Sequence, residues 1–257
     1  MTGILLRAEA LNCYFDGLRA VADLSFEVRS GEIKAVIGPN GAGKSTLFNM
    51  IAGVTRPSSG RVFFDGLRID GMPSFRRARL GIARTFQNLQ IFREMTVLEN
   101  VMTGRHMHGR AGLVTALLHG KTMRAENRAM AEAAIELLAR FELDGKADML
   151  AGDLSFGQAK VLELARALAS EPRLLLLDEP AAGLPQTEAE HMGRIIATLN
   201  RDGMTVLLVE HNMRMVMSLS HDILVLNNGL RIAEGDVETV RRHPDVLAAY
   251  LGEGAHA

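Results

Sequence analysis

The chain has 257 residues, of which 47% are hydrophobic, so it can bury a sizeable core and is not expected to be disordered. Lys and Arg number 29 against 30 for Asp and Glu, and a net charge of -1 argues against a nucleic-acid binder. A single cysteine excludes an intramolecular disulfide, and no apolar run approaches the roughly 20 residues of a membrane span. We therefore expect a soluble, cytoplasmic protein that reaches a membrane only through a partner.

The N-terminal third is predicted to form strands and one helix. Apolar and polar residues alternate over the first thirty residues, which is the period of half-buried strands. Short strands follow at residues 33–37, 60–66 and 81–86, with a helix at residues 44–52. Arg76 and Arg77, like Arg241 and Arg242 near the end, are interpreted as solvated helix faces rather than phosphate tracks.

A phosphate-binding loop is predicted between the strand at residues 33–37 and the helix at residues 44–52. The sequence there matches G-x-x-x-x-G-K-[ST]. Glycines let successive N–H groups point at phosphate oxygens, the Lys44 ammonium reaches the β- and γ-phosphates, the Ser45 hydroxyl can ligate Mg²⁺, and Thr46 can steady the α-phosphate. The predicted nucleotide-binding residues are Gly38, Pro39, Asn40, Gly41, Ala42, Gly43, Lys44, Ser45 and Thr46.

The middle of the chain changes to a helical pattern. Residues 96–107 and 121–141 have helical periodicity, and the second stretch carries one apolar stripe. We interpret residues 88–168 as a helical insertion into an α/β core formed by residues 1–87 and 169–257, all within one domain.

The α/β pattern returns in the last third. Helices are expected at residues 159–169, 187–200 and 212–219, strands at residues 174–177, 205–209, 223–226 and 230–233, and further helices at the C-terminal end. Strands alternating with helices are typical of a mainly parallel sheet that is covered on both faces.

Two acids end the strand at residues 174–177, whose four leucines predict burial on both faces. Asp178 is expected to face the phosphate loop and hold Mg²⁺, and Glu179 to act as the general base that polarises the attacking water. Desolvating two carboxylates that have no partner would cost on the order of several kcal/mol of folding free energy, so a purely structural role is disfavoured.

The segment Leu154-Ser155-Phe156-Gly157-Gln158, placed just before this strand, resembles the L-S-G-G-Q signature of ABC transporter ATP-binding subunits, with Phe156 replacing the first glycine. The resemblance covers essentially the whole chain. It implies a P-loop, RecA-like ABC ATPase core with an N-terminal antiparallel β-subdomain and an inserted α-helical subdomain. It also implies that Ser155, Gly157 and Gln158 belong to the part of the chain that caps the γ-phosphate bound to a second subunit.

The resemblance assigns further roles. Gln87 is similar to the glutamine that senses Mg²⁺ and the γ-phosphate, and His211 to the histidine that contacts the γ-phosphate. Phe15 fits the aromatic residue that stacks on adenine, with Tyr14 as the alternative and core packing open for both. Pro185 departs from the family, which has Asp or Asn there, so the polar contact of that loop is in doubt. Hydrolysis of ATP is still expected.

Residues 85–100, the long insertion, and the ending around Pro244 and Tyr250 are similar to LivG-type subunits of branched-chain amino-acid importers. That implies a second ATPase subunit of the LivF type, with a homodimer as the alternative, a pair of membrane permeases, and indirectly a periplasmic binding protein. The chain would then lie on the cytoplasmic face of the inner membrane. Related systems for urea uptake or lipopolysaccharide export are alternatives.

Two unrelated classes fit less well. A soluble ABC ATPase acting on DNA or ribosomes usually carries two cassettes or a coiled-coil insertion, neither of which is present. A P-loop GTPase needs an N-K-x-D motif, which Asn227-Asn228-Gly229 does not supply.

Overall fold

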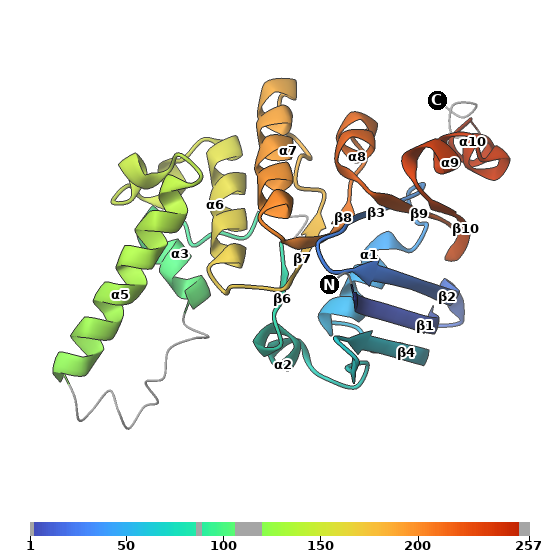
Figure 1. The fold of residues 1–257 in the computed structure, drawn as a ribbon, viewed down its shortest axis with the longest axis horizontal. Helices are drawn as coiled ribbons and strands as arrows, with labels where there is room; N and C mark the ends of the chain where they lie inside the picture. Colours follow the sequence, from blue (N-terminus) through green and yellow to red (C-terminus); the bar gives the residue numbers. More distant parts are fainter. Residues whose placement is uncertain (1–2, 86–88, 106–119, 252–257) are drawn as a thin grey trace. The chain divides into compact units, whose positions relative to one another are not determined.

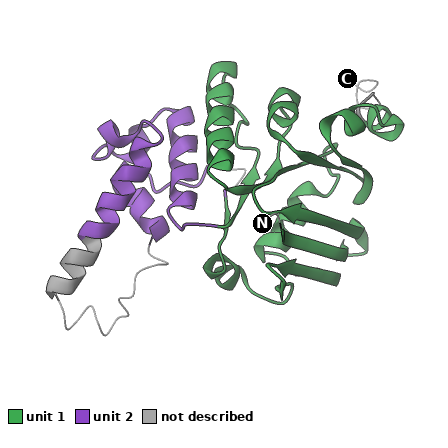
Figure 2. Ribbon diagram, viewed as in Figure 1, with its two compact units in different colours: residues 1–84, 173–257 green, residues 85–172 purple. Residues whose placement is uncertain are grey.

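The computed structural model describes residues 3–85, 89–105 and 120–251 and confirms the α/β fold class. The chain forms two compact units, residues 1–84 with 173–257 and residues 85–172 (Figure 2). The helical segment expected at residues 88–168 falls within the second unit.

The first unit contains two sheets (Figure 1). One is antiparallel in the order β2-β1-β4-β5, and the other has six strands in the order β10-β9-β3-β8-β7-β6. In the six-stranded sheet β9, β3, β8, β7 and β6 run parallel, and β10 is antiparallel to β9. The strands are β1 (Ile4–Phe15), β2 (Leu18–Arg29), β3 (Ile33–Ile37), β4 (Ser59–Phe64), β5 (Leu67–Arg68), β6 (Ile82–Arg84), β7 (Leu174–Asp178), β8 (Thr205–Val209), β9 (Asp222–Asn227) and β10 (Leu230–Gly235).

Six helices belong to the described part of this unit: α1 (Lys44–Ala52), α2 (Ser74–Arg79), α7 (Gln186–Arg201), α8 (Met213–Leu219), α9 (Val237–Arg241) and α10 (Pro244–Leu251). All residues of β3, β7 and β8 are buried, as expected for parallel strands covered on both faces. The sequence analysis missed β5 and gave no bounds for the helix around Arg76 and Arg77, because two and six residues are too short to show a period.

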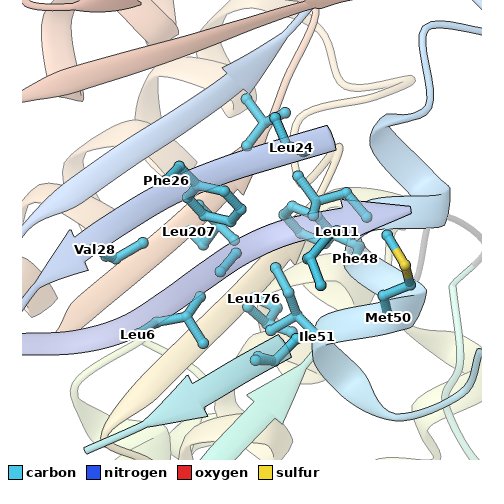
Figure 3. Packing of buried hydrophobic residues seen from close by; sticks show 14 of the residues in the cluster. Leu6, Leu11, Leu24, Phe26, Val28, Phe48, Met50, Ile51, Leu176 and Leu207 are labelled. Carbon is cyan, nitrogen blue, oxygen red and sulfur yellow. The ribbon is translucent and has the colours of Figure 1, made fainter. Parts of the chain in front are cut away.

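The largest core cluster joins both sheets to α1 (Figure 3). Leu11 and Leu24 of the antiparallel sheet, Phe48 of α1, and Leu176 and Leu207 of the parallel sheet belong to it. A second cluster, including Ile37 and Val216, covers the other face of the parallel sheet with α8. Helix α1, which follows the glycine-rich loop, packs against strands of both sheets through the first cluster.

The second unit is helical. It contains α3 (Val97–Arg105), α5 (Gly120–Ala139) and α6 (Phe156–Leu168), with short 3₁₀ helices η2 (Asp144–Lys146) and η3 (Ala151–Asp153). Helix α3 packs against both α5 and α6. Within the described residues, no helix of either unit combines the length and the apolar character of a membrane span.

The interpretation of Arg77 as a solvated residue was wrong. Its side chain is 1% exposed, whereas Arg76 is exposed. The guanidinium donates to the carbonyls of Met50 at 2.6 Å and Ile51 at 2.8 Å, in the last turn of α1, and to Met72 O at 2.9 Å. Carbonyls at a helix end have no partner within the helix, so Arg77 supplies one. Burial lowers the pKa of Arg77 to about 10, which leaves it charged at neutral pH.

Replacing Arg77 with Met should destabilise the protein by about 3 kcal/mol, because buried carbonyls at the end of α1 lose a charged donor. The neighbouring exposed Arg76→Met is the matched control and should change stability little. The measurement is the urea midpoint of unfolding at constant slope. Equal midpoints for the two variants would contradict this role of Arg77.

Candidate functional site

The glycine-rich loop after β3 is held tightly by its neighbours. Gly38, Gly41 and Gly43 have φ angles of 151°, 78° and 99°, in the region that favours glycine. A Cβ atom at Gly38 would lie 2.0 Å from the carbonyl oxygen of Leu226, and one at Gly43 would lie 2.4 Å from that of Ala20. The backbone path of this loop therefore needs glycine for conformation and, at its two ends, for space.

Lys44 begins α1 directly after this loop. Its side chain is buried, and its ammonium donates to Gly38 O at 2.7 Å and to Pro39 O at 2.8 Å. Asn40 and Ser45 are exposed, and Thr46 is partly buried. The positive end of the helix dipole, the backbone N–H groups of the first turn of α1 and the Lys44 ammonium are thus placed together, which is an arrangement that suits a phosphate.

Asp178 is the last residue of β7 and is 2% exposed. Its Oδ2 accepts a hydrogen bond from Arg84 Nη2 at 2.7 Å, and Arg84 Nη1 donates to Asn49 Oδ1 of α1 at 2.6 Å. Arg84 therefore bridges the helix after the glycine loop to the acid at the end of β7, a link that the sequence prediction missed.

The donors available for Mg²⁺ are hard oxygens. The Ser45 hydroxyl and the Asp178 carboxylate are of the kind that Mg²⁺ prefers. Over the described ranges, no cluster of three or more His, Cys, Asp or Glu could hold a metal ion. A Mg²⁺ held by two such protein ligands takes its remaining ligands from water and phosphate oxygens.

Glu179 lies directly after β7 in a left-handed conformation, with φ of 51°. Its backbone N–H donates to Val209 O at 2.9 Å, and its Oε1 lies 2.8 Å from His211 Nε2. An ionised carboxylate only accepts hydrogen bonds, so the hydrogen of this contact sits on His211 Nε2. The Glu179 side chain is 15% exposed and that of His211 48% exposed, so both remain accessible to solvent.

Glu210, between β8 and His211, is another residue that the sequence prediction missed. It is 3% exposed, and its carboxylate accepts hydrogen bonds from three backbone N–H groups on two loops. The signal was present, because an acid that directly follows a buried strand is the pattern that singled out Asp178 and Glu179.

In the helical unit, the predicted signature residues form the start of α6. Ser155 is its N-cap, with Oγ accepting from Gln158 N at 3.3 Å, while Gln158 Oε1 accepts from Ser155 N at 3.2 Å. This capping box starts the helix at Phe156, three residues before the predicted residue 159. Ser155 and Phe156 are exposed, whereas Gly157 is buried.

The sequence analysis also assigned roles or departures to an aromatic residue near the N-terminus, to Pro185 and to Gln87. Phe15 and Tyr14, at the end of β1, are 48% and 49% exposed, so neither is a core side chain. Pro185 occupies the N-cap of α7 and makes no side-chain capping bond. Gln87 lies outside the described residues.

A cavity of about 880 Å³ lies away from these residues, at the other end of β3. Lys34, Asp222 and Glu234 line it, and the Lys34 ammonium donates to both carboxylates. Burial lowers the pKa of Lys34, but the hydrogen bonds to Asp222 and Glu234 outweigh that effect and raise it overall. Charged side chains of both signs therefore line the cavity, with more acids than bases among them.

Comparison with known proteins shows extensive similarity. The sequence profile described as "ABC transporter" matches residues 21–182, and the profile described as "Branched-chain amino acid ATP-binding cassette transporter" matches residues 231–256. The high-affinity branched-chain amino acid transport ATP-binding protein BraF of Pseudomonas aeruginosa is 41% identical over 254 residues, covering 98% of this chain and 100% of BraF. LivG of Escherichia coli is 40% identical over the same length and coverage.

A solved structure shows the same similarity in three dimensions. An ATP-binding cassette of an ABC transporter in its ADP conformation has a TM-score of 0.84 and 34% sequence identity. The match covers 98% of this chain and 99% of the cassette.

Arg84→Met should destabilise the protein by about 3 kcal/mol, because it leaves the buried Asp178 carboxylate without its guanidinium partner. Arg173→Met is the matched control, since Arg173 and Asp65 also lie 2.7 Å apart but their side chains are 51% and 57% exposed. That exposed pair should contribute little. Chemical unfolding of both variants is the measurement, and equal losses would argue against a stabilising role for the Arg84–Asp178 pair.

Proposed function

This chain belongs to the family of ATP-binding, ATP-hydrolysing subunits of ABC transporters, and we propose that it drives the import of branched-chain or closely related amino acids. One observation carries the proposal: the similarity to BraF and LivG runs from end to end and includes the branched-chain-specific C-terminal profile at residues 231–256. Both named relatives act in branched-chain amino acid transport.

In the proposed site, the residues from Gly38 to Thr46 bind the triphosphate of ATP. A phosphate oxygen replaces Gly38 O and Pro39 O as the partner of the Lys44 ammonium. The Ser45 hydroxyl and the Asp178 carboxylate hold Mg²⁺, with Gln87 as a further ligand and sensor. Bound Mg²⁺ neutralises charge on the β- and γ-phosphate oxygens. The ring of Phe15 stacks on the adenine, for which its exposure at the end of β1 leaves room.

Glu179 is the general base of this proposal. Its carboxylate accepts a proton from the attacking water as the water oxygen bonds to the γ-phosphorus and the bond to the β-phosphate oxygen breaks. ADP leaves with the bridging oxygen. The Nε2–H of His211 orients the Glu179 carboxylate through their 2.8 Å contact and can reach the γ-phosphate.

ATP-binding subunits of this family dimerise and pair with permeases. In the proposed complex, Ser155 and the first turn of α6, with Gly157 and Gln158, cap the γ-phosphate held by a second, LivF-type subunit or by a second copy of this chain. The exposed hydroxyl of Ser155 supports this role. A permease pair and a periplasmic binding protein complete the importer, which places the chain on the cytoplasmic face of the inner membrane.

Glu179→Gln should lower the ATP turnover number roughly 10²- to 10⁴-fold, because an amide cannot accept the proton of the attacking water. ATP binding should remain, and the variant should accumulate as a closed dimer with bound ATP. Glu190→Gln, an exposed glutamate on α7, is the control and should keep full turnover. Full activity of Glu179→Gln would remove it as the base.

Uptake of radiolabelled leucine, isoleucine and valine tests the substrate. Cells that carry this chain with its co-encoded transporter subunits should take up these amino acids, and Glu179→Gln should abolish that uptake. Urea uptake in the same cells is the comparison. Loss of urea uptake with unchanged amino-acid uptake would contradict the proposed substrate.

A further inference from the structure

We propose that Glu210 is a positioning residue that locks the loop carrying Glu179 to the loop carrying His211. The inference rests on the proposed function, since it concerns how the two residues of the hydrolytic site are kept in register. Glu210 touches neither nucleotide nor water in this proposal and acts only through the backbone of the two loops.

Three backbone N–H groups donate hydrogen bonds to the one buried carboxylate of Glu210. Glu210 Oε1 accepts from His211 N at 2.9 Å and from Asn212 N at 3.0 Å, both in the loop after β8. Glu210 Oε2 accepts from Ala181 N at 3.1 Å, two residues beyond Glu179 in the loop after β7. The carboxylate therefore spans the two loops, with one oxygen on each.

The two loops also contact each other through Glu179 and His211. Glu179 N donates to Val209 O, just before Glu210, and the Glu179 carboxylate lies 2.8 Å from His211 Nε2. Both loops are short, and one of them contains an exposed imidazole that needs an anchor to keep its direction. The Glu210 carboxylate supplies that anchor through its hydrogen bonds to His211 N and Asn212 N, and it is itself only 3% exposed.

The three N–H groups belong to two loops, so an acceptor oxygen is needed toward each loop. A glutamate carboxylate has two such oxygens. Glutamine has the same shape but one acceptor oxygen, so its NH₂ group would face an N–H group of one loop. The isosteric change Glu210→Gln thus releases one loop and leaves the buried volume unchanged.

The experiment compares Glu210→Gln, Glu210→Asp and wild type in the intact transporter assembled from the full chain and its co-encoded subunits. Glu210→Gln should lower the turnover number roughly 10- to 100-fold, the effect expected from a displacement of about 1 Å in a catalytic group. KM for ATP and ATP affinity should stay within about threefold, because binding relies on the loop after β3. Glu210→Asp keeps the charge but is shorter, and should fall between Gln and wild type.

Amide hydrogen exchange separates positioning from general support of the fold. In the unmodified chain the N–H groups of Ala181, His211 and Asn212 should exchange slowly although they lie in loops. In Glu210→Gln, exchange should speed up in these two loops and nowhere else. Asp236→Asn, which alters the N-cap carboxylate of α9, is the control and should keep wild-type turnover.

Three results would overturn the proposal. They are unprotected amides at these three residues in the wild type, wild-type turnover in Glu210→Gln, or an equal loss of ATP affinity and turnover together with faster exchange throughout the chain. The Glu179→Gln variant is measured in parallel. If it loses turnover while Glu210→Gln keeps it, the positioning role fails and the hydrolytic site stands; if Glu179→Gln keeps turnover, the site itself fails.

Discussion

Three parallel strands that end level with one another determine the candidate site. Val209, the last residue of β8, is the register partner of Val36 in β3 and of Asp178 in β7. The glycine loop, the acid pair and the histidine each begin within two residues of these strand ends. The carboxyl ends of parallel strands are where α/β sheets bind ligands, so the pairing of buried apolar strands brings the chemistry together.

Charged side chains hold helix α1 and the loops after β7 and β8 in place through hydrogen bonds. Arg77 binds carbonyls at the end of α1, Arg84 connects α1 to Asp178, and Glu210 binds N–H groups of two loops. Arg77 and Glu210 are buried and the Arg84 side chain is 10% exposed, and for each of them hydrogen bonds or an opposite charge replace water, which is the condition for burial of an ion. The apolar core sets where the strands and helices lie, and these three ions set how the loops and helix ends are held.

Much of the fold could be predicted because its signals are local. The buried strands β7 and β8 have strand-length apolar runs, β3 is apolar except for Lys34, and the glycine loop is recognisable from residue spacing. Arg77 could not be predicted, because adjacent arginines on a six-residue helix do not reveal which one points inward. Its partners in α1 lie 26 and 27 residues away in sequence, so these contacts exist only after α1 and α2 have packed.

The start of α6 shows the opposite case. Ser155 and Gln158 have the spacing of a capping box, a local signal that places the first turn at Phe156, yet the sequence analysis started the helix at residue 159. The polar cap gives the boundary better than the apolar face, because the first turn of a helix need not contribute to the core. Partners such as Arg84 and Glu210 have no such spacing, since their contacts depend on the order of strands in the sheet.

The backbone of Glu179 has a left-handed conformation, which no sequence motif predicts. A left-handed conformation is unfavourable for a glutamate, by about 1 kcal/mol or more. Among the described residues it also occurs in turns, as at Asp16 and Asn228, inside the long antiparallel strands at Ala10 and Asp23, and at Glu142 and Glu171. Glu179 instead follows directly after a fully buried strand and is held there by Val209 O. If it continued the extended strand, its side chain would follow the alternation of β7. The left-handed turn redirects it to His211, so the strain is consistent with a side chain whose direction matters more than its local stability.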